Sequence, residues 1–535
     1  MTDAFRRERR WLTIAGALTA FSLHAQSGPA APAAPFRLLE TTIDDIHAAM
    51  QSGRLTCRSL TTAYLARIEA YDKHGPAINA VQTVNARALD EADRLDAAFA
   101  ASGAVGPLHC VPMLVKDQIE TRDMPTTFGS ALFRTFTPER DATVVVRLRK
   151  AGALVIGKST MGEFASGYIG SASGVIRNAY DPRRNASGSS GGSASGVAAN
   201  FAAASLGEDT GGSIRGPAAV NNIVGLRPTT ALVSRFGMMP ARPTTDTIGP
   251  LARTVRDLAL VLDAIAGYDP HDLLTAAAAG HVPASYAASL SADDLRGARI
   301  GVIRQPMDAK TDVSSDDYKK VRAVIDRAIA RMAELGAHLV DPVLVPGVVD
   351  RLSRAYDENV FETEAATNAY LAEHANAPVR TFHDILLSGR VAPARARTLM
   401  PSVGKSVGDL GYLRVVLEAD RLRQDVLGIM AEHRLDAIVY ATFDHQGTVI
   451  APDVLTRTSV DDFAGFGNNR RLSPVLGFPA LTVPAGFTSD DLPVGLELMA
   501  RPFEESRLIH LAFAFEQATH HRKPPATVPA LPAAP

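Results

Sequence analysis

Two residue types are scarce in this chain, and their scarcity narrows what it can be. Its 535 residues include two cysteines, Cys57 and Cys110, and one tryptophan, Trp11. The cysteines lack the paired spacing of a zinc site. Trp11 lies near the N-terminus, which weighs against a tryptophan-lined sugar platform or cation cage in the body of the chain. We interpret the cysteines as two separate core thiols, with a disulfide in an oxidising compartment as the alternative.

The chain also lacks an excess of charge of either sign. It has 55 Lys and Arg against 57 Asp and Glu, a formal net charge of −2. Neither a nucleic acid nor an anionic membrane surface is therefore predicted as a partner. No His-Glu-x-x-His motif occurs and the 14 histidines are scattered, so we predict neither a metal nor another cofactor. An apolar content of 46% and a charged content of 21% are ordinary for a soluble globular protein.

The N-terminus has the features of an export signal. Arg6, Arg7, Arg9 and Arg10 precede an apolar run from Trp11 to Leu23, which is too short to span a bilayer comfortably. We predict a signal over residues 1–25 and an Ala/Pro-rich tether over 26–36. The protein would then be periplasmic or secreted, with no membrane attachment after processing. The alternative is a disordered or membrane-anchored N-terminus.

Two Gly/Ser clusters, at residues 188–193 and 210–213, flank a small apolar run at 197–204. A flexible linker would be polar throughout, so we predict a loop, a buried helix or strand, and a second loop. Glycines there allow backbone conformations that a Cβ forbids. Serines in such loops can be held with the hydroxyl facing a reacting group.

Short apolar runs alternate with helical patterns along the rest of the chain, which predicts an α/β fold. The expected helices are 41–50, 59–71, 86–101, 142–151 and one capped by Ser315 and ended by Gly336. The expected strands are 111–115, 153–156, 299–303, 338–345, 437–441 and 480–484, with 232–234 and 258–265 continuing the core. We expect one α/β/α domain over residues 37–526, with a mixed, twisted central sheet covered by helices on both faces. A more polar helical pattern over 353–422 would belong to a variable substrate-side region over 353–470, and 527–535 would form a disordered tail.

Several motifs together resemble the amidase signature family of serine hydrolases, from about residue 40 to about residue 525. They are Val115–Asp117, Gly188–Ser193, Asp209–Arg215, Gly225–Thr229, Asp246–Val255 and Gly477–Pro484. The resemblance implies one large domain that hydrolyses an amide to a carboxylate plus an amine or ammonia. One departure is Cys110, which stands where relatives often carry glycine and would either fill space or narrow the site.

Ser213 is the expected nucleophile. The turn formed by Thr210, Gly211 and Gly212 can aim several backbone N–H groups at one point. The resemblance implies that these amides form an oxyanion hole and that Ser213 becomes acylated. Asp209 and Arg215 flank the turn, and we interpret them as structural charge partners.

Two lysines are candidates for the base, because Lys116 and Lys158 each end an apolar run. The residues alone do not choose between them, whereas the family resemblance implies Lys116. A neutral Lys116 requires its pKa to fall by roughly 3 units from about 10.4, which desolvation can supply.

A second serine must connect Lys116 with Ser213. The resemblance implies that this is Ser189, held in a cis peptide, and we expect Ser190 to support the loop. The alternative is an α/β-hydrolase, in which Ser190 of the Gly-x-Ser-x-Gly pattern attacks with His520 or His521 as base. That motif requires a strand before it, and residues 183–186 do not have the pattern of one.

We predict a small-molecule amide as substrate and a monomer or homodimer. The alternatives are an esterase or carbamate hydrolase on the same site, or a glutamine amidotransferase subunit. Four aromatic residues of the variable region would either line an acyl pocket or belong to the core: Phe361, Tyr370, Phe443 and Phe466.

Overall fold

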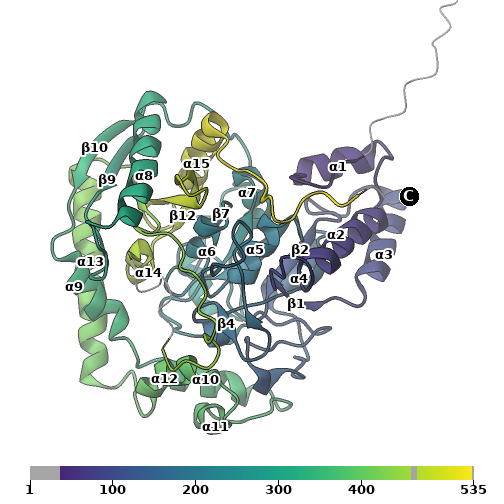
Figure 1. Ribbon diagram of the computed structural model, residues 1–535, viewed down its shortest axis with the longest axis horizontal. Helices are drawn as coiled ribbons and strands as arrows, with labels where there is room; N and C mark the ends of the chain where they lie inside the picture. Colours follow the sequence, from purple (N-terminus) through teal and green to yellow (C-terminus); the bar gives the residue numbers. More distant parts are fainter. Residues whose placement is uncertain (1–35, 460–466, 533–535) are drawn as a thin grey trace, which may run out of the picture. The chain divides into compact units, whose positions relative to one another are not determined.

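The computed structural model describes residues 36–459 and 467–532, and those from Arg37 onward form one compact unit. Within the described residues, a mixed sheet of 11 strands runs in the order β1-β3-β2-β6-β8-β7-β12-β13-β11-β9-β10 (Figure 1). The predicted α/β fold with a mixed central sheet is thus confirmed. The strands are β1 (Val81–Val84), β2 (Pro112–Lys116), β3 (Leu154–Ser159), β6 (Ala204–Glu208), β7 (Val224–Arg227), β8 (Ile248–Ala252), β9 (Arg299–Ile303), β10 (His338–Val343), β11 (Ala437–Ala441), β12 (Ala480–Phe487) and β13 (Pro493–Met499). A separate hairpin pairs β4 (Ile169–Gly170) with β5 (Gly174–Val175).

Both halves of the sheet contain parallel strands. β2 pairs in parallel with β3 and β6, and β9 pairs in parallel with β10 and β11. The strands between these groups are antiparallel. Parallel neighbours need a crossover. The helix α4 (Thr143–Lys150) lies in the crossover between β2 and β3, and α8 (Asp316–Glu334) in the one between β9 and β10. As a result, the carboxyl ends of β2, β3 and β6 lie at one edge of the sheet.

Helices pack around the sheet. They are α1 (Ile43–Gln51), α2 (Cys57–Tyr71), α3 (Ala88–Ser102), α4 (Thr143–Lys150), α5 (Gly191–Ala198), α6 (Arg215–Val220), α7 (Val255–Ile265), α8 (Asp316–Glu334), α9 (Val348–Leu352), α10 (Thr363–Ala372), α11 (Phe382–Leu387), α12 (Pro393–Leu399), α13 (Leu410–Glu432), α14 (Leu472–Leu476) and α15 (Glu505–Thr519). In α8, the Ser315 hydroxyl caps the helix by accepting from the Tyr318 amide at 3.1 Å. No described helix is long and apolar enough to cross a bilayer.

α5 and α6 are the two short helices that carry the Gly/Ser clusters, and every residue of both is buried. α5 begins at Gly191 within the first cluster, and α6 begins at Arg215 directly after the second. The predicted buried element between the two loops is therefore the end of α5 together with β6. The two loops that contain serines meet next to the carboxyl end of β2.

Some predictions were wrong. Residues 232–234 make only an isolated bridge, between Val233 and Ala266. Residues 258–265, by contrast, continue the α/β core as expected, as part of the largely buried helix α7. The strands β1, β7, β8 and β13 were not predicted; each is only four or five residues long or contains glycine, which weakens the sequence pattern.

The C-terminal segment also differs from the expected disordered tail. Figure 1 shows it (yellow) running from α15 towards α2. Arg67 of α2 donates to the carbonyls of Val528 and Pro529, each at 2.8 Å, and Val528 is buried. These bonds hold the chain against the body up to at least residue 529. The predicted signal (1–25) and residues 26–35 of the predicted tether lie outside the described residues.

Candidate active site

Lys116 is the last residue of β2, and its side chain is completely buried. Its Nζ donates to Ser189 Oγ at 2.7 Å. The Gly188–Ser189 peptide is cis, as the family resemblance implied. The carbonyl of Ser189 accepts from the Gly162 amide at 3.0 Å, which holds this serine from a second side. The expected base and bridging serine are therefore in direct contact.

A third residue, not predicted from the sequence, contacts the same lysine. Glu208 ends β6, and its Oε2 lies 2.8 Å from Lys116 Nζ with both side chains fully buried. The Thr210 hydroxyl donates to Glu208 Oε1 at 2.5 Å. The available signal was a glutamate at the end of an apolar strand, directly before the Asp209–Arg215 motif. A buried carboxylate is rare without a partner, so a cation was to be expected beside it.

Burial and charge act against each other at this cluster. Burial lowers the pKa of Lys116, while the carboxylates of Glu208, Asp209 and Asp246 oppose that change. Burial, followed by repulsion from Glu208, raises the pKa of Asp246 to about 7. Asp246 accepts from the amides of Ala241 and Arg242 at 2.7 and 2.9 Å. The site thus concentrates acidic side chains around one buried amine.

Asp209 organises the loop that carries Ser213. Its carboxylate accepts from the amides of Gly212 and Ile214, at 2.7 and 3.0 Å. Gly212 has φ of +108°, which L side chains rarely adopt, and a Cβ there would overlap Arg470. Because Asp209 binds the Gly212 amide, that amide does not point freely towards a substrate. Of the four amides from Thr210 to Ser213, the other three donate to no described atom.

Ser213 lies at the edge of this buried cluster, and 9% of its surface is exposed to solvent. Its carbonyl accepts from the Ser190 amide at 3.2 Å, which joins the two serine loops. Among the described residues, no hydrogen bond connects the hydroxyls of Ser189 and Ser213. Catalytic hydrogen bonds are often long without substrate, so the two serines are compatible with a relay.

Asp209 and Arg215 are charge partners, as expected. Arg215 donates to Asp209 through Nε and Nη2, both at 3.2 Å, and also pairs with the buried Glu497. Arg227 contributes a third bond, to the Asp209 carbonyl. Although burial alone raises the pKa of Asp209, Arg215 and Arg227 hold it far below its usual range. Neither Arg227 nor Glu497 was predicted to belong to this charge cluster.

The remaining serines support the loops. The Ser190 hydroxyl, fully buried, donates to the Glu208 carbonyl at 3.0 Å, so it does not face a cavity as a nucleophile would. Ser193 donates to the Leu206 carbonyl at 3.0 Å. His520 and His521 lie at the end of α15 beside Glu516 and Arg522. The α/β-hydrolase alternative therefore lacks contact between its serine and its base in the described structure.

Lys158, the rival base, has different neighbours. Its Nζ donates to the Thr126 hydroxyl at 2.7 Å and lies 3.9 Å from Asp117 Oδ1. Asp117 in turn accepts from the amides of Thr127 and Gly129. Lys158 thus belongs to a cluster that holds a loop, and Lys116 is the lysine in contact with a candidate serine.

Tyr356 covers the nucleophile loop from the variable region. A Cβ on Gly211 would overlap the Tyr356 hydroxyl. The guanidinium carbon of Arg242 lies 4.5 Å from the Tyr356 ring centroid, and Arg242 also donates to the Tyr356 carbonyl at 2.8 Å. This tyrosine therefore packs against the loop that carries Ser213.

A largely apolar pocket lies close to the end of β2, and Gln118, two residues after Lys116, is part of its lining. Gln118 and Arg395 are polar residues in its lining. Its other walls include Phe128, Met161, Phe164, Met239, Phe382 and Leu399. None of the three described aromatic residues suggested for an acyl pocket lines this one: Phe361 packs on Tyr412, Tyr370 donates to Glu120, and Phe443 contacts Arg470. Phe466 lies outside the described residues.

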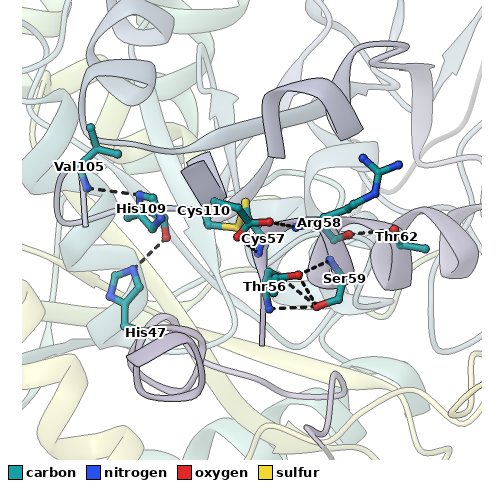
Figure 2. Close-up of a disulfide and its surroundings, with 10 residues drawn as sticks. His47, Thr56, Cys57, Arg58, Ser59, Thr62, Val105, His109 and Cys110 are labelled. Carbon is teal, nitrogen blue, oxygen red and sulfur yellow. Dashed lines mark hydrogen bonds between the residues drawn. A yellow bond between two sulfur atoms is a disulfide. The ribbon is translucent and has the colours of Figure 1, made fainter. Parts of the chain in front are cut away.

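The interpretation of Cys57 and Cys110 as separate thiols was wrong. They form a disulfide with a Cα–Cα distance of 5.6 Å (Figure 2). The bond joins Cys57, the first residue of α2, to Cys110, which lies two residues before the start of β2. Cys110 has φ of +57°, the left-handed region that favours glycine, which fits the glycine that relatives often carry there. The cysteines lie 53 residues apart, so their proximity depends on tertiary structure. The disulfide attaches the strand of Lys116 to the N-terminal helices.

Comparisons with known proteins identify the family to which the chain belongs. A family model described as Amidase matches residues 59–509. The native peptide amidase of Stenotrophomonas maltophilia is 36% identical, with a TM-score of 0.82 over 92% of this chain and 100% of that one. Among sequence relatives, a probable amidase of Arabidopsis thaliana is 33% identical over 92% of both chains. A glutamyl-tRNA(Gln) amidotransferase subunit of Thermosynechococcus vestitus is 33% identical over 90% of this chain and 99% of its own.

Proposed function

Since the chain belongs to the amidase signature family and is an amide-hydrolysing enzyme, we propose that it acts through an acyl-enzyme on Ser213. Ser189 and Lys116 form the proton relay. The observation that carries this proposal is the 2.7 Å contact between Lys116 Nζ and Ser189 Oγ, in a fully buried position beside the Ser213 loop. A metal-free acyl transfer needs a nucleophile, a base that later acts as acid, and oxyanion donors, and this site has a candidate for each.

The reaction proceeds in two halves. Ser213 Oγ attacks the amide carbonyl carbon while its proton passes to Ser189, whose own proton passes to Lys116. When the tetrahedral intermediate collapses, the C–N bond breaks and the relay returns a proton to the leaving nitrogen. Water then attacks the Ser213 ester by the same relay, and the carboxylate product leaves.

The oxyanion is bound by backbone amides of residues 210–213. We assign this role to Thr210, Gly211 and Ser213, since the Gly212 amide is bound by Asp209. Removing one oxyanion donor typically costs about 3 kcal/mol of transition-state stabilisation. Asp209, Arg215 and Gly212 then act by fixing the conformation of the loop.

For the substrate we propose an amide whose acyl part bears an apolar group, such as the C-terminal amide of a peptide. The apolar pocket next to β2 supports this choice, as does the similarity to a peptide amidase. An ester or carbamate of the same shape would reach the same nucleophile. Hydrolysis rates measured on an amide, an ester and a carbamate that share one acyl group separate the three.

The proposal is tested by labelling with a fluorophosphonate, which reacts with activated serines. We expect one adduct per chain, located on Ser213 by peptide mass spectrometry. Ser213→Ala abolishes labelling and amide hydrolysis, whereas Ser190→Ala retains both because Ser190 only holds the loop. Labelling that persists in Ser213→Ala and disappears in Ser190→Ala would instead support the hydrolase mechanism based on Ser190.

An amidotransferase subunit is the second candidate, because several relatives carry that name. Ammonia release from glutamine by the purified chain, dependent on a partner protein, would favour it. The same preparation, run through size-exclusion chromatography with light scattering, distinguishes the proposed monomer or homodimer from a larger assembly.

We also propose that the protein is exported. Residues 1–25 have a basic segment, an apolar run and a small-residue site, and the two cysteines form a bond that persists in oxidising compartments. Cell fractionation with N-terminal sequencing of the mature protein tests this. A mature chain that begins at residue 1 or 2 in the cytoplasmic fraction would contradict it.

A further inference from the structure

Glu208 is a buried charged residue in contact with the proposed relay, and the mechanism above does not use it. Its Oε2 is 2.8 Å from Lys116 Nζ, almost the distance that separates the same nitrogen from Ser189 Oγ, 2.7 Å. Lys116 thus lies between a hydroxyl and a carboxylate, in hydrogen-bond contact with both. A proton that arrives from Ser189 has a second acceptor available one hydrogen bond further on.

The surroundings of this pair come from four elements. Lys116 comes from β2, Glu208 ends β6, and Asp209 directly follows that strand. Asp246 precedes β8 and faces Glu208 and Lys116, and Arg227 of β7 contributes a guanidinium. Asp209 is already paired with Arg215 and Arg227. Glu208 is therefore the carboxylate that is in contact with the lysine amine itself.

Both partners are also confined. Lys116 and Glu208 are completely buried, and Thr210 Oγ1 donates to the second carboxylate oxygen at 2.5 Å. Moving a lone ammonium or a lone carboxylate to such a position is strongly unfavourable, and a pair that shares its protons avoids that cost. A neutral lysine beside an ionised Glu208 would leave a carboxylate buried without a cation in contact.

We propose that Lys116 and Glu208 act as one proton-sharing unit, in which the lysine amine passes the relay's proton on to the Glu208 carboxylate. This inference rests on the proposed function and adds a residue to it. Glu208 acts through Lys116 and is a positioning residue that sets the protonation state of the relay. Lys116 is then an ammonium in the resting enzyme and becomes neutral only as it passes a proton to Glu208, so it does not have to be neutral beforehand.

The protons balance along this path. Ser213 loses its proton as its Oγ–C bond forms, and Ser189 takes that proton while giving its own to Lys116. Lys116 first gives one proton to Glu208, which frees the nitrogen lone pair that accepts the proton of Ser189. The lysine therefore ends as an ammonium, Glu208 as a carboxylic acid, and the new negative charge lies on the oxyanion. On collapse, the proton of Glu208 returns through Lys116 and Ser189 to the leaving nitrogen.

The sharing predicts the direction of a pH effect. In the native enzyme, Glu208 can accept the relay's proton while Lys116 starts as an ammonium, so kcat/KM does not require the lysine to be deprotonated beforehand. Without the carboxylate, the amine alone is the base and must first lose its proton. The acidic limb of the kcat/KM profile is the part in which activity falls as the pH is lowered. It then moves to higher pH, because an unperturbed lysine keeps its proton up to about pH 10.4 and an unperturbed glutamate only up to about pH 4.3.

Glu208→Gln is the test, since it keeps the shape of the side chain and removes the proton acceptor. We expect the acidic limb of the kcat/KM profile for an amide to rise by at least about one pH unit, with activity recovering at alkaline pH. Glu505→Gln is the matched control. Glu505, at the start of α15, is equally buried and accepts from the Thr229 amide, so its replacement should leave the limb in place.

Two outcomes overturn the inference. A limb that moves to lower pH means that Glu208 only held the ammonium, so that its removal eases deprotonation of Lys116. A limb that does not move means that Glu208 takes no part in proton transfer. If Glu208→Gln does not fold, Thr210→Val removes the donor to Oε1, makes the carboxylate more basic and raises the limb in the same direction.

Failure of this inference is distinguishable from failure of the proposed function. Fluorophosphonate labelling of Ser213 in the native enzyme tests the acyl-enzyme mechanism and does not depend on Glu208. Native labelling together with an unchanged Glu208→Gln profile would refute the sharing alone. Absent labelling of Ser213 would refute the mechanism on which both rest.

Discussion

Lys116 is the last residue of β2 and Lys158 the next to last residue of the neighbouring parallel strand β3. Both side chains are fully buried, yet their surroundings differ. Lys116 contacts Ser189 and Glu208, whereas Lys158 contacts Thr126 and approaches Asp117. The register explains the difference. Lys116 pairs with Ser159, and Lys158 pairs with Val115, so the two lysines are offset by one residue. Side chains alternate between the faces of a strand, which directs the lysines to opposite sides of the sheet.

Burial alone therefore does not identify a catalytic lysine. Burial lowers the pKa of both amines, that of Lys158 to about 8. The two lysines differ in the residues within hydrogen-bond distance. Lys116 contacts a serine beside the nucleophile loop, whereas Lys158 contacts a threonine that holds another loop. The experiments below act on that contrast, in decreasing order of expected effect.

Replacing each lysine with a neutral residue should give opposite results. Lys116→Ala removes the relay, so kcat/KM for an amide should fall by about 10²–10⁴-fold, the range that general acid–base residues contribute. Lys158→Met removes an equally buried charge on the other face, so kcat/KM should change by less than about tenfold, or about 1.4 kcal/mol. Steady-state kinetics, with circular dichroism to verify folding, measures both. Equal losses in the two variants would contradict the assignment of Lys116.

The two strands also differ in how they are attached, because the disulfide precedes β2 and not β3. A bond between residues 53 apart restricts the unfolded chain, which corresponds to about 4 kcal/mol in the chain-entropy model. Cys57→Ser with Cys110→Ser should therefore lower the free energy of unfolding by about 2–4 kcal/mol, measured in urea. Since the disulfide contacts neither lysine, kcat at room temperature should be retained. A variant as stable as the native protein would show that the bond adds no stability.

Stability should depend on pH through Lys158. Its folded pKa, about 8, lies below the unfolded value of 10.5, so the unfolded state binds more protons between these limits. The free energy of unfolding should therefore rise as the pH rises from about 8 to about 10.5, by up to about 3 kcal/mol relative to Lys158→Met. Below this window both states are protonated and the difference is constant. Parallel urea titrations of the native protein and the variant at several pH values measure the slope, and equal slopes would contradict the assigned shift.

Local patterns predicted much of the fold. The clearest case is α8, where Val321, Ile325 and Met332 lie on the buried face and Ser315 caps the helix, both as expected. The runs that became β2, β3, β9 and β11 were predicted to within three residues at each end. These elements could be recognised because their signal, periodicity plus a cap or a glycine, lies within the segment itself.

The parts that were missed depend on distant residues. Glu208 could be recognised as a charged residue on an apolar strand, but its contact with Lys116 joins residues 92 apart in the chain. The disulfide joins Cys57 and Cys110 only because α2 packs beside the segment that leads into β2. The apolar pocket draws Phe128, Phe164 and Phe382 from three separate segments, which no single window of sequence reveals.

The sequence by itself identifies the candidate catalytic residues. They are Ser213 after two glycines, the serines of the Ser189 loop, and two lysines at the ends of apolar runs. Which lysine meets Ser189 follows only from the folded chain. A strand presents alternate faces, so a one-residue offset between β2 and β3 sends two similar amines to opposite sides of the sheet. The same sheet order, with β6 next to β2, brings Glu208 to Lys116.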